Sequence, residues 1–153
     1  QIGVYMVKFE DFKKENYEDL LGMMRLFYRS DAVADPIDES VIEKLLKDIL
    51  SREYSIRGYG ARFKGDLVGF GIVTSYYASE VAGITIQLED LFISEDYRSM
   101  GIAQEYFAKV KDDFPEAARY RLEVCASNQR AIDLYKRLGF EVLEYVQMVD
   151  DQI

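Results

Sequence analysis

Residues 88–103 read Leu88-Glu89-Asp90-Leu91-Phe92-Ile93-Ser94-Glu95-Asp96-Tyr97-Arg98-Ser99-Met100-Gly101-Ile102-Ala103, and this stretch decides the fold. The branched residues over 84–93 predict a strand, and the apolar spacing that begins at Ile102 predicts a helix that stops near Pro115. Another strand is predicted over 120–126. A strand–helix–strand step of this kind predicts a parallel, right-handed crossover within the sheet.

The turn inside this stretch has the features of a diphosphate site. A helix that begins there directs unpaired N–H groups and the positive end of its dipole forward, which favours an anion. Gly101 lets the backbone approach closely, Ala103 lets the helix lie near the strand, and Arg98 adds a positive charge. An ordinary strand-to-helix turn that contains glycine is an equally good interpretation of the pattern Arg-x-x-Gly-x-Ala when it stands alone.

Hydrophobic periodicity predicts the remaining elements. We expect strands over 3–9, 54–63, 67–75, 84–93, 120–126 and 142–149, and helices over 17–28, 41–49, 102–110 and 131–138. The second and third strands form a hairpin about Lys64-Gly65-Asp66. This order predicts an α/β (α+β) fold: a mixed, mostly antiparallel sheet flanked by helices, with a central parallel β-α-β step. No linker or repeat interrupts residues 1–153, which are expected to form a single domain.

Composition excludes several classes of chemistry. The chain of 153 residues has no histidine and one cysteine, which removes Ser-His and Cys-His nucleophile pairs and argues against a metal site. A net charge of −9 argues against nucleic acid as a partner, and either attracts a cationic substrate or only keeps the protein soluble. No export leader or membrane-spanning run is visible, so a cytoplasmic protein without a membrane partner is expected. Cys125 is expected to be a small core residue inside a strand.

Two motifs in the chain resemble those of the GNAT superfamily of N-acetyltransferases. The first is Leu-Glu-Asp-Leu-Phe-Ile followed by Tyr-Arg and Arg98-x-x-Gly101-x-Ala103, and the second is Asn128-x-x-Ala131-x-x-Leu134-Tyr135-x-x-Leu138-Gly139-Phe140. The Leu-Glu-Asp form is similar to the diamine and thialysine acetyltransferase branch in particular. The resemblance implies one N-acetyltransferase domain that uses acetyl-CoA as co-substrate and no metal.

The resemblance also implies which residues hold the donor. Backbone groups of the end of the central strand would pair with the pantetheine arm as an added strand does, and the amides of the turn would hold the diphosphate. Arg121 matches a position beside the cofactor less securely, and Ser99 and Ala103 stand where the family often has glycine. The implied cofactor-binding residues are Leu91, Phe92, Ile93, Arg98, Ser99, Met100, Gly101, Ile102, Ala103, Gln104, Asn128 and Tyr135.

Two residues are the expected catalytic groups. Tyr135 either belongs to the apolar stripe of its helix or protonates the departing CoA thiolate, a modestly uphill transfer from a phenol of pKa ~10 to a thiolate whose thiol has a pKa of ~8.5. Glu89 is expected to act as the base, directly or through water, or to anchor the amine. Because Glu89 and Asp90 are neighbours on a strand, we expect them to face opposite ways. A simple strand-end ion pair with Arg98 or Arg121 is the alternative.

The acceptor is expected to be a primary amine of a small cationic metabolite that attacks the thioester directly in a ternary complex. Tyr28, Asp31 and Glu89 are the expected substrate-binding residues, since anions and aromatic faces suit an ammonium ion. Asp35, Tyr76 and Tyr77 are weaker candidates for the same role. A protein or peptide acceptor and a non-catalytic CoA-binding module remain open as alternatives. The strand after Phe140 also leaves an edge that would let two copies pair as a homodimer.

Overall fold

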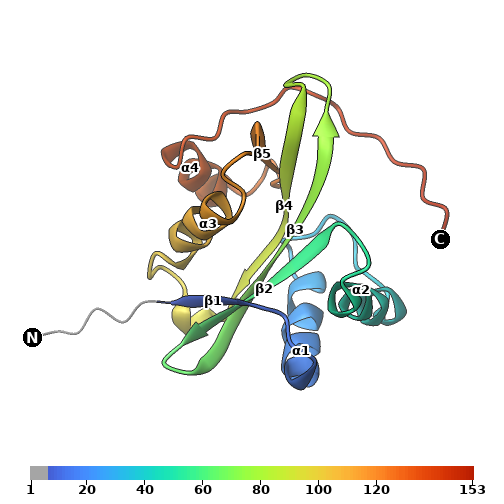
Figure 1. Ribbon diagram of the computed structural model, residues 1–153, viewed down its shortest axis with the longest axis vertical. Helices are drawn as coiled ribbons and strands as arrows, with labels where there is room; N and C mark the ends of the chain where they lie inside the picture. Colours follow the sequence, from blue (N-terminus) through green and yellow to red (C-terminus); the bar gives the residue numbers. More distant parts are fainter. Residues whose placement is uncertain (1–6) are drawn as a thin grey trace, which may run out of the picture.

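The computed structural model describes residues 7–153 (Figure 1). The strands and helices follow the predicted order as far as the last helix. Their bounds are β1 Lys8–Asp11, α1 Tyr17–Tyr28, α2 Glu39–Ser51, β2 Ile56–Phe63, β3 Asp66–Ala78, β4 Gly83–Ile93, α3 Ile102–Asp113, β5 Arg119–Leu122 and α4 Gln129–Arg137. Within this part of the chain, no helix has the length and apolar character needed to cross a membrane.

The strands form one five-stranded sheet in the order β1-β2-β3-β4-β5. The first four strands pair antiparallel, and β5 pairs parallel to β4 after the crossover through α3. The mixed sheet with its parallel β-α-β step is therefore confirmed. Helices α1 and α2 cover one face of the sheet, and α3 and α4 cover the other (Figure 1).

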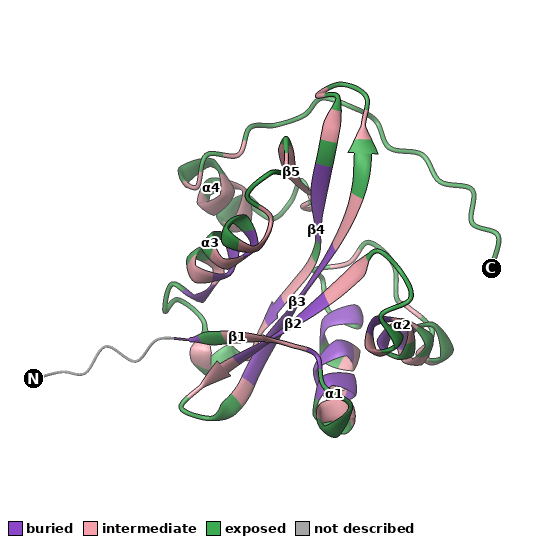
Figure 2. Cartoon of the chain, viewed as in Figure 1, coloured by how far each residue is buried: buried purple, intermediate pink, exposed green. Residues whose placement is uncertain are grey.

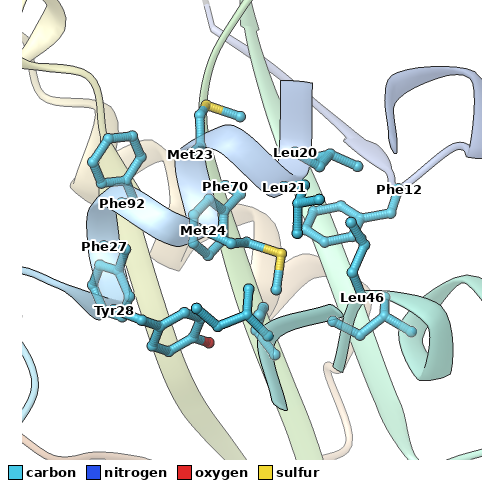
Figure 3. Packing of buried hydrophobic residues seen from close by; sticks show 13 residues of the cluster. Phe12, Leu20, Leu21, Met23, Met24, Phe27, Tyr28, Leu46, Phe70 and Phe92 are labelled. Atoms are coloured by element: carbon cyan, nitrogen blue, oxygen red, sulfur yellow. The ribbon is translucent and has the colours of Figure 1, made fainter. Parts of the chain in front are cut away.

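Aromatic and aliphatic side chains bury the face of the sheet under α1. Figure 3 shows Met24 and Phe27 of α1 lying over Phe70, with Phe92 of the neighbouring strand beside it. The rings of Phe27 and Phe70 meet edge-on with centroids 5.8 Å apart. Because α1 packs directly on β3 and β4, the last residue of this helix, Tyr28, is held against β4 and becomes part of the site described below. The most buried strand segments run through the centre of the sheet (Figure 2).

The strand predicted over 142–149 is wrong. From residue 140 to the end the chain has no regular secondary structure and passes over the tip of the β3–β4 hairpin (Figure 1). Val146 is 91% exposed, and the segment lies beside no strand whose backbone it can pair with. Branched residues favour a strand only where a neighbouring strand and a buried face are available. Pairing with a second copy stays a prediction.

Two other predicted strands have different bounds in the described part of the chain. The first begins at Lys8, and residues 3–6 of the predicted range lie outside the described part of the chain. The strand predicted over 120–126 ends at Leu122, where the β4–β5 ladder also ends. Because β5 stops pairing with β4 at this point, a gap opens between the two segments, and the candidate site described below lies in this gap.

Candidate active site

Strands β4 and β5 separate after a short parallel ladder. The ladder runs from Thr85 opposite Arg119 to Leu88 opposite Leu122, and no pair follows it. Residues 91–93 of β4 continue beyond this point with partners only on β3. Their edge on the β5 side therefore has no strand partner, although the carbonyl of Ile93 accepts from the Arg98 side chain, and an edge of this kind is suited to an added strand.

A β-bulge lies at the point where the strands separate. Ile72 of β3 is opposite Asp90 and Val73 is opposite Leu88, so that Glu89 is an extra residue in β4 without a partner in the register. A bulge of this kind breaks the alternation of side chains along the strand. It explains why two adjacent carboxylates reach the same side of the sheet.

Glu89 and Asp90 both form hydrogen bonds on the α1 side, so the prediction that they face opposite ways is wrong. The hydroxyl of Thr74 donates to Oε1 of Glu89 at 2.9 Å, and Thr74 alternates with Val73, which packs on the α3 side. The hydroxyl of Tyr28 donates to Oδ2 of Asp90 at 2.5 Å. The strand therefore presents a pair of acidic groups, Glu89 exposed and Asp90 half-buried.

The two carboxylates differ in environment. Burial raises the pKa of Asp90 to about 6, the nearby charge of Glu89 acts in the same direction, and the hydrogen bond from Tyr28 opposes them. Burial and the Asp90 charge also raise the pKa of Tyr28, which stays a neutral donor. Asp90 therefore has a pKa closer to that of a working general base than an ordinary carboxylate has. Sequence reasoning missed this, because nothing in one sequence shows where a bulge falls.

A pocket of about 150 Å³ lies in the gap between β4 and the chain that follows β5. It brings Glu89 together with Asn128 and Tyr135, as the sequence predicted. Its other lining residues come from α1 and the loop after it, from β4, from α3, and from the end of β5 and the chain beyond it: Phe27, Ala32, Leu88, Asp90, Leu91, Tyr106, Phe107, Leu122, Glu123, Val124 and Cys125. A larger hollow of about 460 Å³ at the β2–β3 turn is open and contains none of the predicted site residues.

Tyr135 packs as a core residue does and also lines the pocket. Its ring packs edge-on against Phe107 at 5.7 Å and against Phe140 at 6.2 Å, so the side chain belongs to the α3–α4 packing. Burial raises its pKa. Its hydroxyl has no hydrogen-bond partner among residues 7–153, and the residue lines the pocket. A phenol in this position is able to donate a proton to a bound group.

The turn before α3 has the geometry of an anion site. Ser99 and Gly101 take positive φ angles of 62° and 78°, and Gly101 caps α3 without a side-chain hydrogen bond, which leaves the first amides of the helix unpaired. Nε of Arg98 donates to the carbonyl of Ile93 at 2.8 Å and ties the turn to β4. Nη2 of Arg130 donates to Oγ of Ser99 at 2.7 Å.

Arg130 is a residue that the sequence analysis did not select. It extends from the first turn of α4 to the turn before α3, and so adds a second guanidinium beside the unpaired amides. Free N–H groups at a helix start with two arginines nearby fit a diphosphate. The signal was available in the sequence, because Arg130 lies two residues after Asn128 in the second motif.

The other predicted residues divide into those near the pocket and those outside it. Asn128 lines the pocket, and its side-chain oxygen caps α4 by accepting from the amide of Ala131 at 3.2 Å. Cys125 is not inside a strand as expected, since β5 has already ended, and it is a half-buried pocket residue. Asp31 is exposed beside Ala32, which lines the pocket. Other candidates lie elsewhere: Asp35 is exposed in the same loop, Tyr77 is exposed on β3, and Arg121 donates to the hydroxyl of Tyr76 at 3.4 Å.

The chain belongs to the acetyltransferase (GNAT) family, whose model matches residues 14–140. Among curated proteins it is similar to the thialysine N-epsilon-acetyltransferases of Sus scrofa, with 36% identity over 75 residues, and of Bos taurus, with 37% identity over 79 residues. These matches cover 48% and 50% of the chain, and 44% and 46% of the relatives, so the matched segment is less than half of each relative.

Solved structures share the fold at low sequence identity. An aminoglycoside N-acetyltransferase in complex with CoA superimposes with a TM-score of 0.78 at 16% identity, over 100% of this chain and 99% of that one. A ribosomal-protein-alanine N-acetyltransferase from Brucella melitensis biovar Abortus 2308 has a TM-score of 0.74 at 17% identity, over 95% of this chain and 100% of that one. The resemblance to the GNAT superfamily and the fold class expected from the sequence are confirmed.

Proposed function

We propose that the protein transfers an acetyl group from acetyl-CoA to a primary amine of a small cationic compound. The observation that carries this proposal is the gap between β4 and β5, which has two carboxylates on one side and Tyr135 on the other. The turn before α3 adds a site for a diphosphate. The curated relatives are named for acetylation of a small amino compound, which supports the same class of acceptor.

Residues on both sides of the gap would hold the donor. The β5-side edge of residues 91–93, which has no strand partner, would bind the pantetheine arm as an added strand does. The first amides of α3, with Arg98 and Arg130, would bind the diphosphate, and Asn128 would contact the arm from α4. Acetyl-CoA supplies the activated acetyl thioester, and the chain supplies orientation and proton transfer.

Removal of a proton from the amine is the harder acid–base step. An alkylammonium ion has a pKa of ~10.4, so deprotonation at pH 7 costs about 4.6 kcal/mol. Glu89, exposed at the rim, binds the ammonium ion and assists loss of its proton. Asp90 lies next to it with a pKa of about 6, which makes it the better final acceptor of that proton.

Return of a proton to the leaving thiolate is assigned to Tyr135. Tyr135 lines the same pocket as Glu89, and its hydroxyl has no competing partner among the described residues. Because burial raises its pKa, the phenol is protonated at neutral pH and is ready to donate. The amine would thus lose its proton to the carboxylates of β4, and the thiolate would receive a proton from Tyr135 of α4, within one pocket.

The proposal is tested by release of free thiol from acetyl-CoA in the presence of different acceptors. We expect turnover with polyamines, lysine analogues such as thialysine, or aminoglycosides, and little turnover with peptides. Glu89→Gln should raise KM for the amine and leave the affinity for acetyl-CoA unchanged, because Glu89 lies away from the diphosphate turn. Tight binding of CoA without turnover of any amine contradicts the proposal and favours a non-catalytic module. Turnover only with peptides contradicts the small-amine acceptor.

A further inference from the structure

Residues 141–153, which we call the C-terminal arm, expose apolar side chains along an extended stretch of chain. Val146 and Met148 are 91% and 90% exposed, and the arm has no regular secondary structure. Among the described residues, one hydrogen bond joins the arm to the rest of the chain, from the hydroxyl of Tyr145 to Oε2 of Glu80 at 2.7 Å. An exposed apolar segment of this length indicates a surface that another part of a protein covers.

The path of the arm leads it away from the free edge of its own sheet. After α4 the chain passes over the tip of the β3–β4 hairpin, where Tyr145 meets Glu80, and its last residues project beyond the body of the molecule (Figure 1). Strand β5 lies on the opposite side of β4 from β3. Residues 146–149 therefore extend away from β5 and do not pair with it in the same copy.

Strand β5 has a free edge that suits such an arm. Residues 119–122 pair with β4 on one side, and the sheet ends at β5, so no strand among residues 7–153 occupies the other side. A free edge presents backbone N–H and C=O groups to any extended segment that reaches it. The arm has the branched residues that favour a strand once such a partner is available.

Charge favours β5 over β1, the strand at the other end of the sheet. The arm has four acidic residues and no lysine or arginine. Strand β5 carries Arg119 and Arg121 and no acidic residue. Strand β1 carries Lys8 together with Glu10 and Asp11. Because opposite charges stabilise a pair of neighbouring strands and like charges oppose it, the arm fits β5 better.

Helix α4 lacks cover in a single copy. None of its residues is buried, whereas α1, α2 and α3 each bury three or more side chains. Tyr135 and Leu138 pack in one cluster with residues of α3 and β5, but Ile132 and Leu134 are only half-buried. A strand added beside β5 would extend the sheet under α4 and would cover this helix further.

We propose that the protein forms a dimer in which the arm of each copy adds as a strand to β5 of the other copy. Each copy gives an exposed apolar segment and receives one at an edge that its own arm leaves empty. The exchange is reciprocal, so a two-fold axis satisfies both copies and closes the assembly. Helix α4 follows its cap Asn128 and carries Tyr135, so the added strand also supports the pocket wall on that side.

The oligomeric state of the whole chain tests this arrangement. Sedimentation equilibrium at micromolar concentrations should give a dimer, and a chain that ends at Phe140 should give a monomer. Val146→Lys should raise the dissociation constant of the dimer roughly tenfold or more, because it removes an apolar side chain from the contact and adds positive charge near the arginines of β5. Val146 is exposed in a single copy, so the subunit should still fold. A monomeric wild type, or a dimer that Val146→Lys does not weaken, overturns the inference.

Leu26→Lys is the matched control. Leu26 of α1 is an apolar residue that is 65% exposed, and it lies outside the proposed contact. We expect the dissociation constant of this variant to equal that of the wild type. Equal weakening by both variants would mean that added charge acts on the dimer in general, and would overturn the inference.

Hydrogen exchange distinguishes strand exchange from other arrangements. Edge amides of residues 119–122 and amides of residues 142–149 should be protected in the dimer, and both should lose protection together on dilution to the monomer. Protection of the arm in the monomer would mean that it folds back on its own β5, and a dimer with an unprotected arm would mean that the copies meet at another surface. Either result overturns the inference. These measurements do not depend on acetyl transfer, so a protein that acetylates no amine contradicts the proposed function alone.

Discussion

At the scale of single residues, two adjacent carboxylates have become chemically different groups. Glu89 is exposed and accepts from Thr74, whereas Asp90 is shielded and accepts from Tyr28. The difference arises from the extra residue in β4, which places both on one side of the sheet at different depths. Residue type alone therefore does not say which carboxylate holds a proton near neutral pH.

The raised pKa of Asp90 predicts a pH-dependent cost in stability. The folded protein binds this proton at a pKa of about 6, above the ordinary value of 3.8, so the ionised form is disfavoured in the fold. The stabilisation available from the protonated form is present below pH ~4 and is lost as pH rises through about 6. The cost at pH 7 is at most about 3 kcal/mol, from a shift of roughly 2 units at 1.36 kcal/mol each.

Asp90→Asn should remove that cost, because an amide keeps the acceptor for Tyr28 without the charge. The free energy of unfolding by urea, relative to that of the wild type, should increase between pH 4 and pH 7 and then stay level. Parallel pH curves for Asp90→Asn and the wild type would show that Asp90 ionises freely in the fold.

Tyr135→Phe tests the proton donor at the same scale. The variant keeps the edge-on packing against Phe107 and removes only the hydroxyl. We expect turnover to fall roughly tenfold or more, while the dissociation constant of acetyl-CoA measured by calorimetry stays nearly the same. Tyr120→Phe is a suitable control, because that hydroxyl donates to the carbonyl of Phe114 outside the pocket. Equal turnover of Tyr135→Phe and wild type would remove Tyr135 from the mechanism.

At the scale of elements, hydrophobic periodicity predicted the helices and strands that bury an apolar face against another part of the same chain. The four helices and the β2–β3 hairpin fall where their apolar spacing placed them, because each packs one face on the sheet. The segment over 142–149 has the composition of a strand but lies beside no strand. Hydrophobic periodicity does not show whether a neighbouring strand is available for pairing. Register irregularities are equally invisible, so the bulge at Glu89 and the role of Asp90 required the structure.

The sequence motifs also predicted some of the residues at the candidate site and missed others. Motif residues Glu89, Asn128 and Tyr135 do meet at one pocket, because the β-α-β step and α4 bring the two motifs together. Arg130 reaches the turn before α3 through a hydrogen bond to Ser99. A contact of this kind depends on how two elements lie in space, which spacing along the chain does not encode.

The start of α3 gives a prediction for donor binding. Gly101 takes a φ of 78° at the cap of the helix, where a side chain is strained and a negative charge would oppose the diphosphate. Gly101→Asp should abolish acetyl-CoA binding in calorimetry while the protein stays folded by circular dichroism. Gly65→Asp is the matched control, because Gly65 also has a positive φ, 87°, but lies in the β2–β3 turn. Retained binding in Gly101→Asp, or equal loss in both variants, would count against the diphosphate site.

At the scale of the whole molecule, opposite charges mark the two proposed ligand sites. The chain carries a net charge of −9, yet the turn before α3 gathers Arg98 and Arg130 for an anionic donor. The acceptor side instead has Glu89 and Asp90. In the proposed reaction, the acidic protein would attract a cationic acceptor over long range and would bind its anionic donor through local groups that salt screens less.

This separation predicts opposite responses to salt for the two ligands. Between about 20 and 200 mM salt, the Debye length falls from roughly 20 to 7 Å, so long-range attraction is largely screened. We expect kcat/KM for a polyamine of charge about +3 or +4 to fall several-fold over this range, and that for a monoamine to fall much less. KM for acetyl-CoA should change little or decrease, since screening also weakens its repulsion by the acidic surface. Stopped assays with both amines at fixed saturating acetyl-CoA measure the two slopes, and a choline salt in place of NaCl controls for specific ion effects. Equal slopes for the polyamine and the monoamine would mean that the acidic surface only keeps the protein soluble, and that selection of the amine is made inside the pocket alone.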